Sequence, residues 1–365
     1  MAVRSPSKSV PTIKQVADDA KVSRATVSRA LNQPQLVSRE TAASVRAAAA
    51  RLGYVPNQTA RALSTGRAGN IALVVPDITN PFFAALMRGA QARARDQGFA
   101  TFLGDSDETP ELEDVLLMRL SAQVEGFILA SSRLPEKRVR EHAQRRPFVL
   151  INRDLPHLSR LLIDTGPSYA RAVEHLASLG HRSVAYVAGP RMSWSNRERS
   201  RAVMKSAQRL GLQAIQIPTL RPSYEAGRAC TGDLLNAKVT AALAFDDVMA
   251  QGIMAGLASR GLSVPADFSV IGCDGVLATT TYPPLTSVAS HCAAVGEQAV
   301  DLLVGALGSA AVREKRISLP TELIIRATTA APAQHSRLSA ASMRLRPVEI
   351  GNETEAVGIA AASTE

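Results

Sequence analysis

The chain has 365 residues, of which 46% are hydrophobic and 20% charged, and its formal net charge is +10. This length exceeds what one compact domain usually holds, and the composition excludes a disordered protein and a membrane protein. The charge is uneven: residues 1–67 hold 11 Lys and Arg against 3 Asp and Glu, whereas residues 68–365 hold 31 against 29. A basic segment on a nearly neutral body predicts a polyanionic partner for the first 67 residues.

The sequence also argues against secretion, membrane insertion and metal binding. The first twenty residues contain no apolar run like that of a signal peptide, and no stretch approaches the roughly 18 apolar residues of a membrane span. Cys230, Cys273 and Cys292 lie far apart, and the six His residues form no metal-binding pair. We therefore expect a cytoplasmic protein with buried, inert thiols, no metal and no cofactor.

Residues 11–55 have the pattern of three short helices. Apolar residues recur at helical spacing over residues 13–20 and 24–32, with a break between the two segments. Ser23 and Ser38 are good N-caps for the second and third helices. Two short helices joined by a tight turn and followed by a third predict a helix-turn-helix arrangement.

A short linker follows at residues 56–67. Pro56 favours a helix start and Gly66 a stop, but the segment is too short to be a stable helix alone in water. We expect it to become helical on a template. Its exposed Leu63 is unusual in so polar a segment.

From residue 70 onward, strands and helices alternate. The predicted strands are Ile71–Val75, Ala100–Leu103, Gly126–Ala130, Phe148–Asn152, Val184–Val187, Ala214–Ile217, Ala241–Phe245 and Ser269–Cys273. The predicted helices between them are Phe82–Gln97, Leu112–Ala122, 135–144, Tyr169–Leu179, 197–210, 225–235 and 247–260. This alternation predicts parallel sheets covered by helices on both faces, and its length predicts two lobes.

The segments Thr12–Asn32 and Gly53–Asn57 closely resemble the LacI/GalR family, the relatives of the lactose repressor, and the resemblance extends over residues 11–330. It implies an all-α helix-turn-helix head on a two-lobed α/β body like that of periplasmic binding proteins, with two parallel, doubly wound sheets. It also implies a bacterial transcription regulator, expected to be a repressor, that acts as a homodimer on a palindromic operator.

The resemblance sets the expected domain boundaries. In chain order we expect a flexible N-terminus (1–10), a helix-turn-helix domain (11–55), a hinge helix or linker (56–67), an effector-binding and dimerisation domain (68–330) and a disordered tail (331–365). Within the fourth unit, the N-lobe is expected to take about 68–161 and 286–316, and the C-lobe about 162–285 and 317–330.

The second helix has the chemistry of a major-groove reader, because short polar and basic side chains lie at its N-terminal end. Arg29 can bind guanine in bidentate fashion, and Lys21 occupies a turn position where the family often has Gly. In the family, a leucine at the position of Leu63 wedges into the minor groove and kinks the duplex. The residues expected to contact DNA are Thr12, Ser23, Arg24, Ala25, Thr26, Ser28, Arg29, Asn32, Asn57, Ala60 and Leu63.

The resemblance also implies a ligand site between the lobes. The residues expected to bind the effector are Asn80, Phe82, Asn152, Arg153, Arg199, Asp246, Asp274 and Ser290. Phe83 is expected in the core. Ser290 stands where many sugar-responsive members have Gln, and Pro222 where several have a stacking aromatic, while Asp246 replaces the usual Asn. A sugar, a polyol and a nucleoside all remain open as the effector.

Three other classes of protein compete with this interpretation. The missing signal peptide and the attached helix-turn-helix argue against a transporter-type binding protein. The sequence contains no nucleophile elbow, Walker loop or Gly-rich dinucleotide fingerprint, so we do not expect an enzyme. A global regulator controlled by a phosphoprotein corepressor remains the alternative. The expected cleft residues Arg199 and Asp274 favour a small ligand over that alternative.

Overall fold

The computed structural model describes residues 11–55, 68–308 and 314–333, so the linker 56–67 and the tail from residue 334 lie outside the described residues. Three helices form the head: α1 (Ile13–Asp19), α2 (Arg24–Asn32) and α3 (Arg39–Leu52), with a 3-10 turn (Pro34–Leu36) before α3. Their buried apolar side chains, among them Val16, Val27 and Val45, pack into one small core. The predicted helical head is confirmed.

Local capping explains where these helices begin and end. Ser23 and Ser38 cap α2 and α3 as predicted, and each side chain accepts the backbone N–H three residues on at 3.1 Å. Gly53 ends α3 in the left-handed conformation, with φ 67°. Lys21, in the turn between α1 and α2, also has a positive φ of 53°, so this lysine adopts the conformation that favours glycine.

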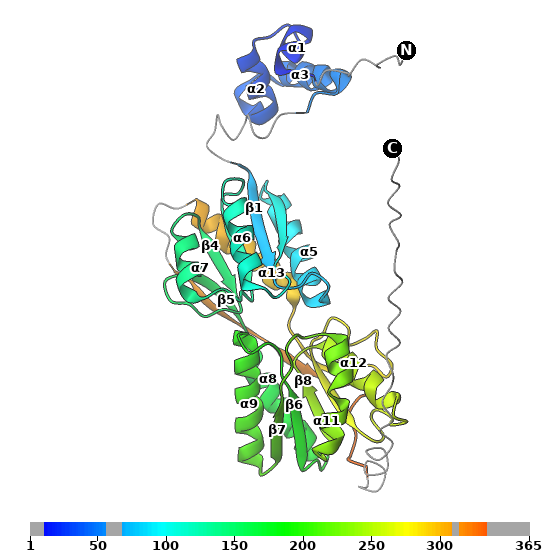
Figure 1. Cartoon of the computed structure of the whole chain (residues 1–365). Helices are drawn as coiled ribbons and strands as arrows, with labels where there is room; N and C mark the ends of the chain where they lie inside the picture. The colour runs from blue at the N-terminus through cyan, green and yellow to red at the C-terminus, as the bar shows by residue number, and fades with distance from the viewer. Residues whose placement is uncertain (1–10, 56–67, 309–313, 334–365) are drawn as a thin grey trace, which may run out of the picture.

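Each lobe of the body contains a six-stranded sheet with helices on both faces (Figure 1). The N-lobe elements are β1 (Asn70–Val75), α5 (Pro81–Asp96), β2 (Ala100–Asp105), α6 (Pro110–Leu120), β3 (Phe127–Ala130), α7 (Glu136–Ala143), β4 (Phe148–Ile151), β5 (Ser159–Asp164), α13 (Cys292–Leu307) and β11 (Arg316–Pro320). The C-lobe elements are α8 (Gly166–Ser178), β6 (Ser183–Val187), α9 (Trp194–Leu210), β7 (Gln213–Ile217), α10 (Tyr224–Ala229), α11 (Thr231–Asn236), β8 (Ala241–Ala244), α12 (Asp247–Ala258), β9 (Ser269–Asp274), β10 (Thr286–Ala289) and β12 (Glu322–Ile324).

The strand order confirms the predicted fold class. The N-lobe sheet has the order β11-β5-β4-β3-β1-β2, and all of its neighbouring strands are parallel. The C-lobe sheet has the order β12-β10-β9-β8-β6-β7, in which β12 is antiparallel to β10 and the other pairs are parallel. The body therefore consists of two doubly wound α/β lobes.

The central strands are buried on both faces. In β1, Ile71, Leu73 and Val75 face a core covered by α5 and α13, whereas Ala72 and Val74 face a second core beneath α6 and α7. The side chains of β6 divide in the same way between the α10–α12 side and the α8–α9 side. Burial on both faces explains why these strands have continuous apolar sequences.

Helix α13 comes late in the chain but packs beside α5 in the N-lobe (Figure 1). The two backbones approach closely. A Cβ added to Gly89 would lie 2.0 Å from the Ala293 carbonyl oxygen, and one added to Gly296 would lie 2.1 Å from that of Leu86. Glycine is therefore required at both positions.

Within the described residues, the chain crosses between the lobes three times. The crossings follow Asp164 at the end of β5, Ala289 at the end of β10 and Pro320 at the end of β11. The expected lobe boundaries lie three or four residues before these points. The strands continue to the carboxyl edge of their sheets, where both lobes meet, so the chain can change lobes only after that edge.

Two other predictions need correction. The helix expected over 225–235 is broken at Cys230, because the Cys230 thiol and the Thr231 hydroxyl bond back to carbonyls at the end of α10. Residues 331–333, expected to belong to the tail, are described and lie beside the C-lobe. His181 Nε2 lies 3.0 Å from the Ala330 carbonyl, and Pro332 packs 3.8 Å from where a Cβ on Gly180 would stand.

Candidate functional site

The exposed face of α2 gathers several residues expected to read DNA. Arg24, Ala25, Ser28 and Arg29 are exposed, while Val27 and Ala30 are buried beneath them. Neither arginine forms an ion pair with a described residue. Two free guanidinium groups beside small side chains suit contact with base edges in a major groove. Three further expected contacts lie outside the described residues: Asn57, Ala60 and Leu63.

The other expected contacts of the head form local hydrogen bonds, and two of them, Thr12 and Ser23, cap helices. Ser23 Oγ lies 2.9 Å from the Thr26 hydroxyl in addition to capping α2. Thr12 caps α1 by accepting the backbone N–H three residues on at 3.4 Å, and Asn32 Nδ2 donates to Ser28 Oγ at 3.4 Å. These caps hold the helix N-termini, whose free N–H groups can bind phosphate oxygens.

A small cavity lies between the two lobes, where their strands end. Its volume is about 30 Å³, which leaves room for no more than a few water molecules. The N-lobe contributes Asn80, Phe82, Phe83, Glu108, Ser131, Arg133 and Asn152, and the C-lobe contributes Ser193, Ser195, Arg199, Pro222, Phe245, Asp246 and Asp274. The lobes are closed around this space, so a larger ligand can enter only when they open.

Backbone strain gathers around this cavity. Four of its lining residues have a positive φ without being glycine: Glu108 (56°), Ser131 (49°), Asn152 (54°) and Asp274 (97°). Each of them lies at the carboxyl end of a strand or just after it. Such conformations persist only where surrounding structure fixes them, and they cluster at ligand sites.

Asn80 and Asp246 join the lobes across the cavity. Asn80 caps α5 by accepting the Phe82 N–H through Oδ1 at 3.0 Å, which turns its Nδ2 toward Asp246 Oδ2, also at 3.0 Å. Asp246 caps α12 by accepting the Met249 N–H at 2.8 Å. Because both side chains are buried, opening the lobes here breaks a buried hydrogen bond.

A second contact between the lobes lies at the surface. Arg221 of the C-lobe donates to Asp107 Oδ1 at 2.8 Å and to the Asp107 carbonyl oxygen at 2.6 Å. The side chains are 53% and 70% exposed. Arg221 and Asp107 directly precede Pro222 and Glu108, which line the cavity, so this ion pair stands beside the cavity wall.

Arg199 is a buried cation in the C-lobe wall. Its guanidinium donates to the Phe245 carbonyl oxygen and to Asp274 Oδ1, the latter at 3.3 Å. It also lies 4.7 Å from the centre of the Phe245 ring. The structure therefore brings together Arg199 and Asp274, two of the residues expected from sequence. A guanidinium beside a carboxylate can bind adjacent hydroxyl groups.

An ion pair that the sequence interpretation missed lies in the N-lobe wall. Arg133 donates to Glu108 Oε1 at 2.8 Å, and the two side chains are 5% and 9% exposed. Glu108 follows β2 and Arg133 follows β3, at the edge where ligands of parallel sheets bind. Both residues closely follow predicted strands in the sequence, and this position could have identified them as candidates for the site.

Two expected residues do not line the cavity. Arg153 donates to a backbone carbonyl at 2.8 Å, and the Ser290 hydroxyl is buried without a hydrogen-bond partner among the described residues. Phe83 packs in the core as expected and also lines the cavity, with its ring 4.9 Å from that of Phe82. Pro222, which stands where several members of the family have a stacking aromatic residue, also lines the cavity.

The carboxyl groups in the C-lobe wall, and Asp247 beside it, are costly to ionise. Burial, followed by repulsion from Asp274, raises the pKa of Asp246 to about 7. The same two causes raise the pKa of Asp247 to about 7, and burial raises the pKa of Asp274. Groups with strongly shifted pKa values in a cleft favour a functional site there.

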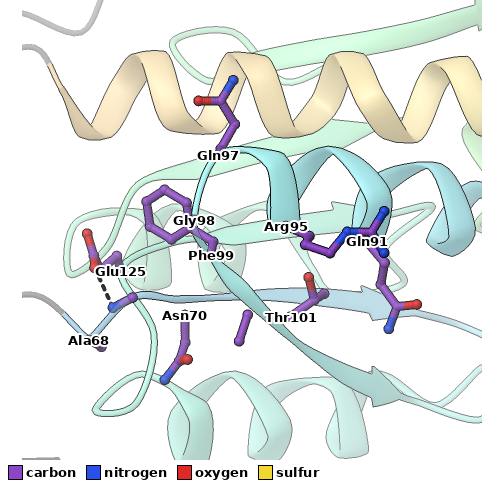
Figure 2. A pocket seen from close by; sticks show the side chains of 11 residues that line it. Ala68, Asn70, Gln91, Arg95, Gln97, Gly98, Phe99, Thr101 and Glu125 are labelled. Atoms are coloured by element: carbon purple, nitrogen blue, oxygen red, sulfur yellow. Dashed lines mark hydrogen bonds between the residues drawn. The ribbon is translucent and has the colours of Figure 1, made fainter. Parts of the chain in front are cut away.

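A larger hollow of about 820 Å³ lies at the other end of the N-lobe sheet (Figure 2). It surrounds the amino ends of β1 and β2, and its wall includes the exposed side chains of Gln91 and Arg95. Figure 2 shows Glu125 beside the start of β1, where Oε1 accepts the Gly69 N–H at 2.7 Å. Ligands of parallel sheets bind at the opposite, carboxyl ends of strands, so the interlobe cavity is the better candidate.

Two features are absent from the part of the chain that the structure describes. No helix there is long and apolar enough to cross a membrane. No three His, Cys, Asp or Glu side chains gather there as the ligands of a metal ion would. The three cysteines, Cys230, Cys273 and Cys292, are buried and free, as expected.

Comparison with known proteins places both parts of the chain. Residues 12–57 match the family model "Bacterial regulatory proteins, lacI family", and residues 173–329 match "Periplasmic binding protein-like domain". The chain is 32% identical over 329 residues to the transcriptional repressor CytR of Escherichia coli K12, covering 88% of this chain and 96% of the relative.

Solved structures agree with these matches. The lac repressor dimer bound to operator and the anti-inducer ONPF is similar with a TM-score of 0.79 and 29% identity, covering 88% of this chain and all of that chain. A LacI family regulator from Enterococcus faecium with bound ribose is similar with a TM-score of 0.66 and 30% identity, over 72% of this chain and all of that one.

Proposed function

The chain belongs to the LacI family of bacterial DNA-binding transcription regulators, and from this premise we propose that it is a cytoplasmic repressor that binds a palindromic operator as a homodimer. A small-molecule effector, a sugar, polyol or nucleoside, binds between the lobes and controls operator affinity. No catalytic role is part of the proposal.

The observation that carries the effector proposal is the closed cavity with buried polar groups from both lobes. Arg199 and Asp274 in the C-lobe face Asn80 and Asn152 in the N-lobe, and all four are at least 93% buried. Burying charged and amide groups costs free energy unless they are hydrogen-bonded or paired, and a few convergent polar groups in a cavity are typical of a ligand site. The similar regulator with bound ribose supports a hydroxyl-rich ligand.

Contacts across the cavity supply a route from ligand to DNA. The Asn80–Asp246 hydrogen bond and the Arg221–Asp107 ion pair both join one lobe to the other. A ligand that replaces or completes these contacts changes the relative stability of two lobe arrangements. The lobe arrangement in turn favours or disfavours ordering of the linker 56–67 on DNA.

For DNA recognition, we assign base contacts to Arg24, Ala25 and Arg29 and phosphate contacts to Ser23, Thr26 and Ser28. The exposure of Arg24 at the start of α2 and of Arg29 in its last turn supports these roles. Thr12 and Asn32, with the linker residues Asn57, Ala60 and Leu63, complete the proposed interface.

Exposed apolar side chains support the homodimer. Leu220 and Tyr282 of the C-lobe are each 96% exposed, and Tyr224 lies four residues after Leu220 with 39% exposed. In the N-lobe, Phe102 and Leu103 are exposed on the edge strand β2. These side chains are candidates for the dimer interface, and the similar lac repressor was solved as a dimer.

The effector is tested by screening the full-length protein against sugars, polyols and nucleosides by thermal shift. A ligand at a hundredfold excess over its Kd stabilises the protein by about 2.7 kcal/mol, which shifts melting measurably. A hit is then expected to change operator affinity in a titration at fixed salt. If no small molecule shifts melting, the effector proposal fails, and a pull-down with phosphorylated cell proteins tests the phosphoprotein alternative.

A further inference from the structure

The interlobe cavity holds more acidic than basic groups. Its lining carboxyl groups are Glu108, Asp246 and Asp274, and its lining guanidinium groups are Arg133 and Arg199. Arg133 pairs with Glu108 at 2.8 Å, and Arg199 pairs with Asp274 at 3.3 Å. Among the described residues, Asp246 is the lining carboxylate that these two ion pairs leave without a cation.

The present partners of Asp246 are uncharged. Its two oxygens accept one hydrogen bond each, from Asn80 Nδ2 and from the Met249 N–H. A carboxylate has about four acceptor sites, so two remain for a donor in the cavity. The pKa of Asp246, raised by burial to about 7, agrees with a carboxylate that lacks a counter-charge.

No neighbouring cation among the described residues forms an ion pair with Asp246, and burial and Asp274 raise the pKa of Asp246 by more than the charge of Arg199 lowers it. Asp247, only 1% exposed, accepts from the Ser287 hydroxyl at 2.6 Å and adds a further acidic group beside the wall. On the N-lobe side, Arg153 bonds to a backbone carbonyl and stands near the buried Glu113. The N-lobe side is therefore balanced in charge, and the acidic excess lies in the C-lobe wall around Asp246.

We propose that the effector carries an ammonium group that pairs with Asp246, next to hydroxyl groups bound by Arg199 and Asp274. The chemical class is an amino sugar or an aminated polyol. This inference rests on the proposed function, because it assumes that the cavity binds an effector. An ammonium group completes a third ion pair, whereas a phosphorylated or carboxylated ligand meets an unpaired carboxylate and is rejected.

The position of Asp246 gives the ammonium group a second role. Asp246 accepts the hydrogen bond that Asn80 donates from the other lobe, so this carboxylate joins the two lobes. A cation bound there strengthens or displaces the same interlobe contact, so recognition of the amine and the arrangement of the lobes are coupled at one carboxylate.

The test measures binding of matched ligands to the full-length protein by thermal shift and calorimetry at pH 7. The probes are D-glucosamine, D-galactosamine and D-mannosamine, each beside its parent sugar, its N-acetyl derivative and its 6-phosphate. We expect an amino sugar to bind about tenfold or more tightly than its parent, and acetylation to remove that advantage. A parent or phosphorylated sugar that binds more tightly than its amine overturns the inference and leaves the proposed function standing.

The variant Asp246→Asn is expected to lose the tenfold preference for the amine over its parent sugar, whatever change the substitution makes to the affinity for both ligands. Asp233→Asn, which changes an exposed aspartate on α11 of the same lobe, is the control and keeps the preference. If Asp246→Asn does not fold, the wild-type series decides alone. If no probe of the series binds, the amine proposal is overturned, and the wider ligand screen decides the effector role separately.

Discussion

The DNA-reading face of the head and the interlobe cavity treat charged side chains in opposite ways. On α2, Arg24 and Arg29 are exposed and form no ion pair with a described residue. They therefore stay hydrated in the free protein, and the cost of removing that water arises only when DNA binds. In the cavity, Arg133 and Arg199 are already buried and paired. Changes in the head should therefore alter binding and its salt dependence, whereas changes in the cavity should first alter folding stability.

The largest expected effect lies in the cavity, at Arg199. The substitution Arg199→Leu leaves Asp274 buried without its cation, so the free energy of unfolding should fall by about 3–5 kcal/mol. Urea denaturation measures this change. Arg201→Leu on the same helix is the control, because Arg201 is 68% exposed and should change stability by less than about 1 kcal/mol. Equal stability of the two variants would contradict the comparison.

The next effect is a pH dependence from Asp246. Its folded-state pKa of about 7 lies above its usual value of 3.8, so protonation favours the folded state and this stabilisation is lost as the pH rises through 7. Between pH 5 and pH 8, wild-type stability should fall relative to Asp246→Asn by roughly 2.5 kcal/mol. Denaturation at several pH values measures the difference, and parallel pH profiles for both proteins would refute the assignment.

Leu63 sharpens the comparison on the DNA side. It lies outside the described residues, and its role as a wedge in the minor groove stays a prediction from sequence. Leu63→Ala should weaken specific operator binding on the order of 2 kcal/mol while bulk DNA binding changes little. Titrations at fixed salt with operator and random DNA separate the two. Equal weakening of both would sink the wedge role.

Arg29→Ala should cost about 1–3 kcal/mol of operator affinity and relax specificity at one base pair, with folding stability unchanged. Binding to operator variants measures this. Arg51→Ala is a matched control in the head, because Arg51 pairs with Asp19 at 2.6 Å on a different helix. A loss of folding stability in Arg29→Ala would show that Arg29 supports the fold of the head, as the buried arginines support the cavity.

The smallest effect is expected for Arg221→Ala, which removes the surface ion pair between the lobes. Because both side chains are more than half exposed, stability should fall by about 0.2–1 kcal/mol, and added salt should reduce the difference. Denaturation at low and high salt checks this. A larger, salt-independent loss would show that this contact behaves like the buried pairs of the cavity.

Features that depend on a few neighbouring residues were predictable from the sequence. Ser23, Ser38 and Gly53 set the ends of the head helices through local hydrogen bonds and backbone conformation. The strand β5, in contrast, was not predicted. Its second residue, Arg160, is charged yet only 5% exposed. Two ion pairs hold it there, one with Asp154 in the preceding loop and one with Glu314, which is distant in the sequence.

The cavity wall was predictable in part. Asn80, Asp246 and Asp274 closely follow or end strong apolar strands, so their place at the carboxyl edge could be expected. The ion pair of Glu108 with Arg133 depends on the order of strands in the sheet, since β2 and β3 lie on either side of β1. One sequence does not specify which loops meet there.

The three crossings between the lobes have a consequence for the synthesis of the chain. The edge strands β11 and β12 lie within residues 316–324, and each completes a different sheet. As the chain leaves the ribosome, both lobes therefore stay incomplete until nearly all of the body has been made. Until α13 emerges, the N-lobe core that it covers is exposed to water. The nascent chain therefore depends on chaperones, or on rapid completion and folding, to avoid aggregation.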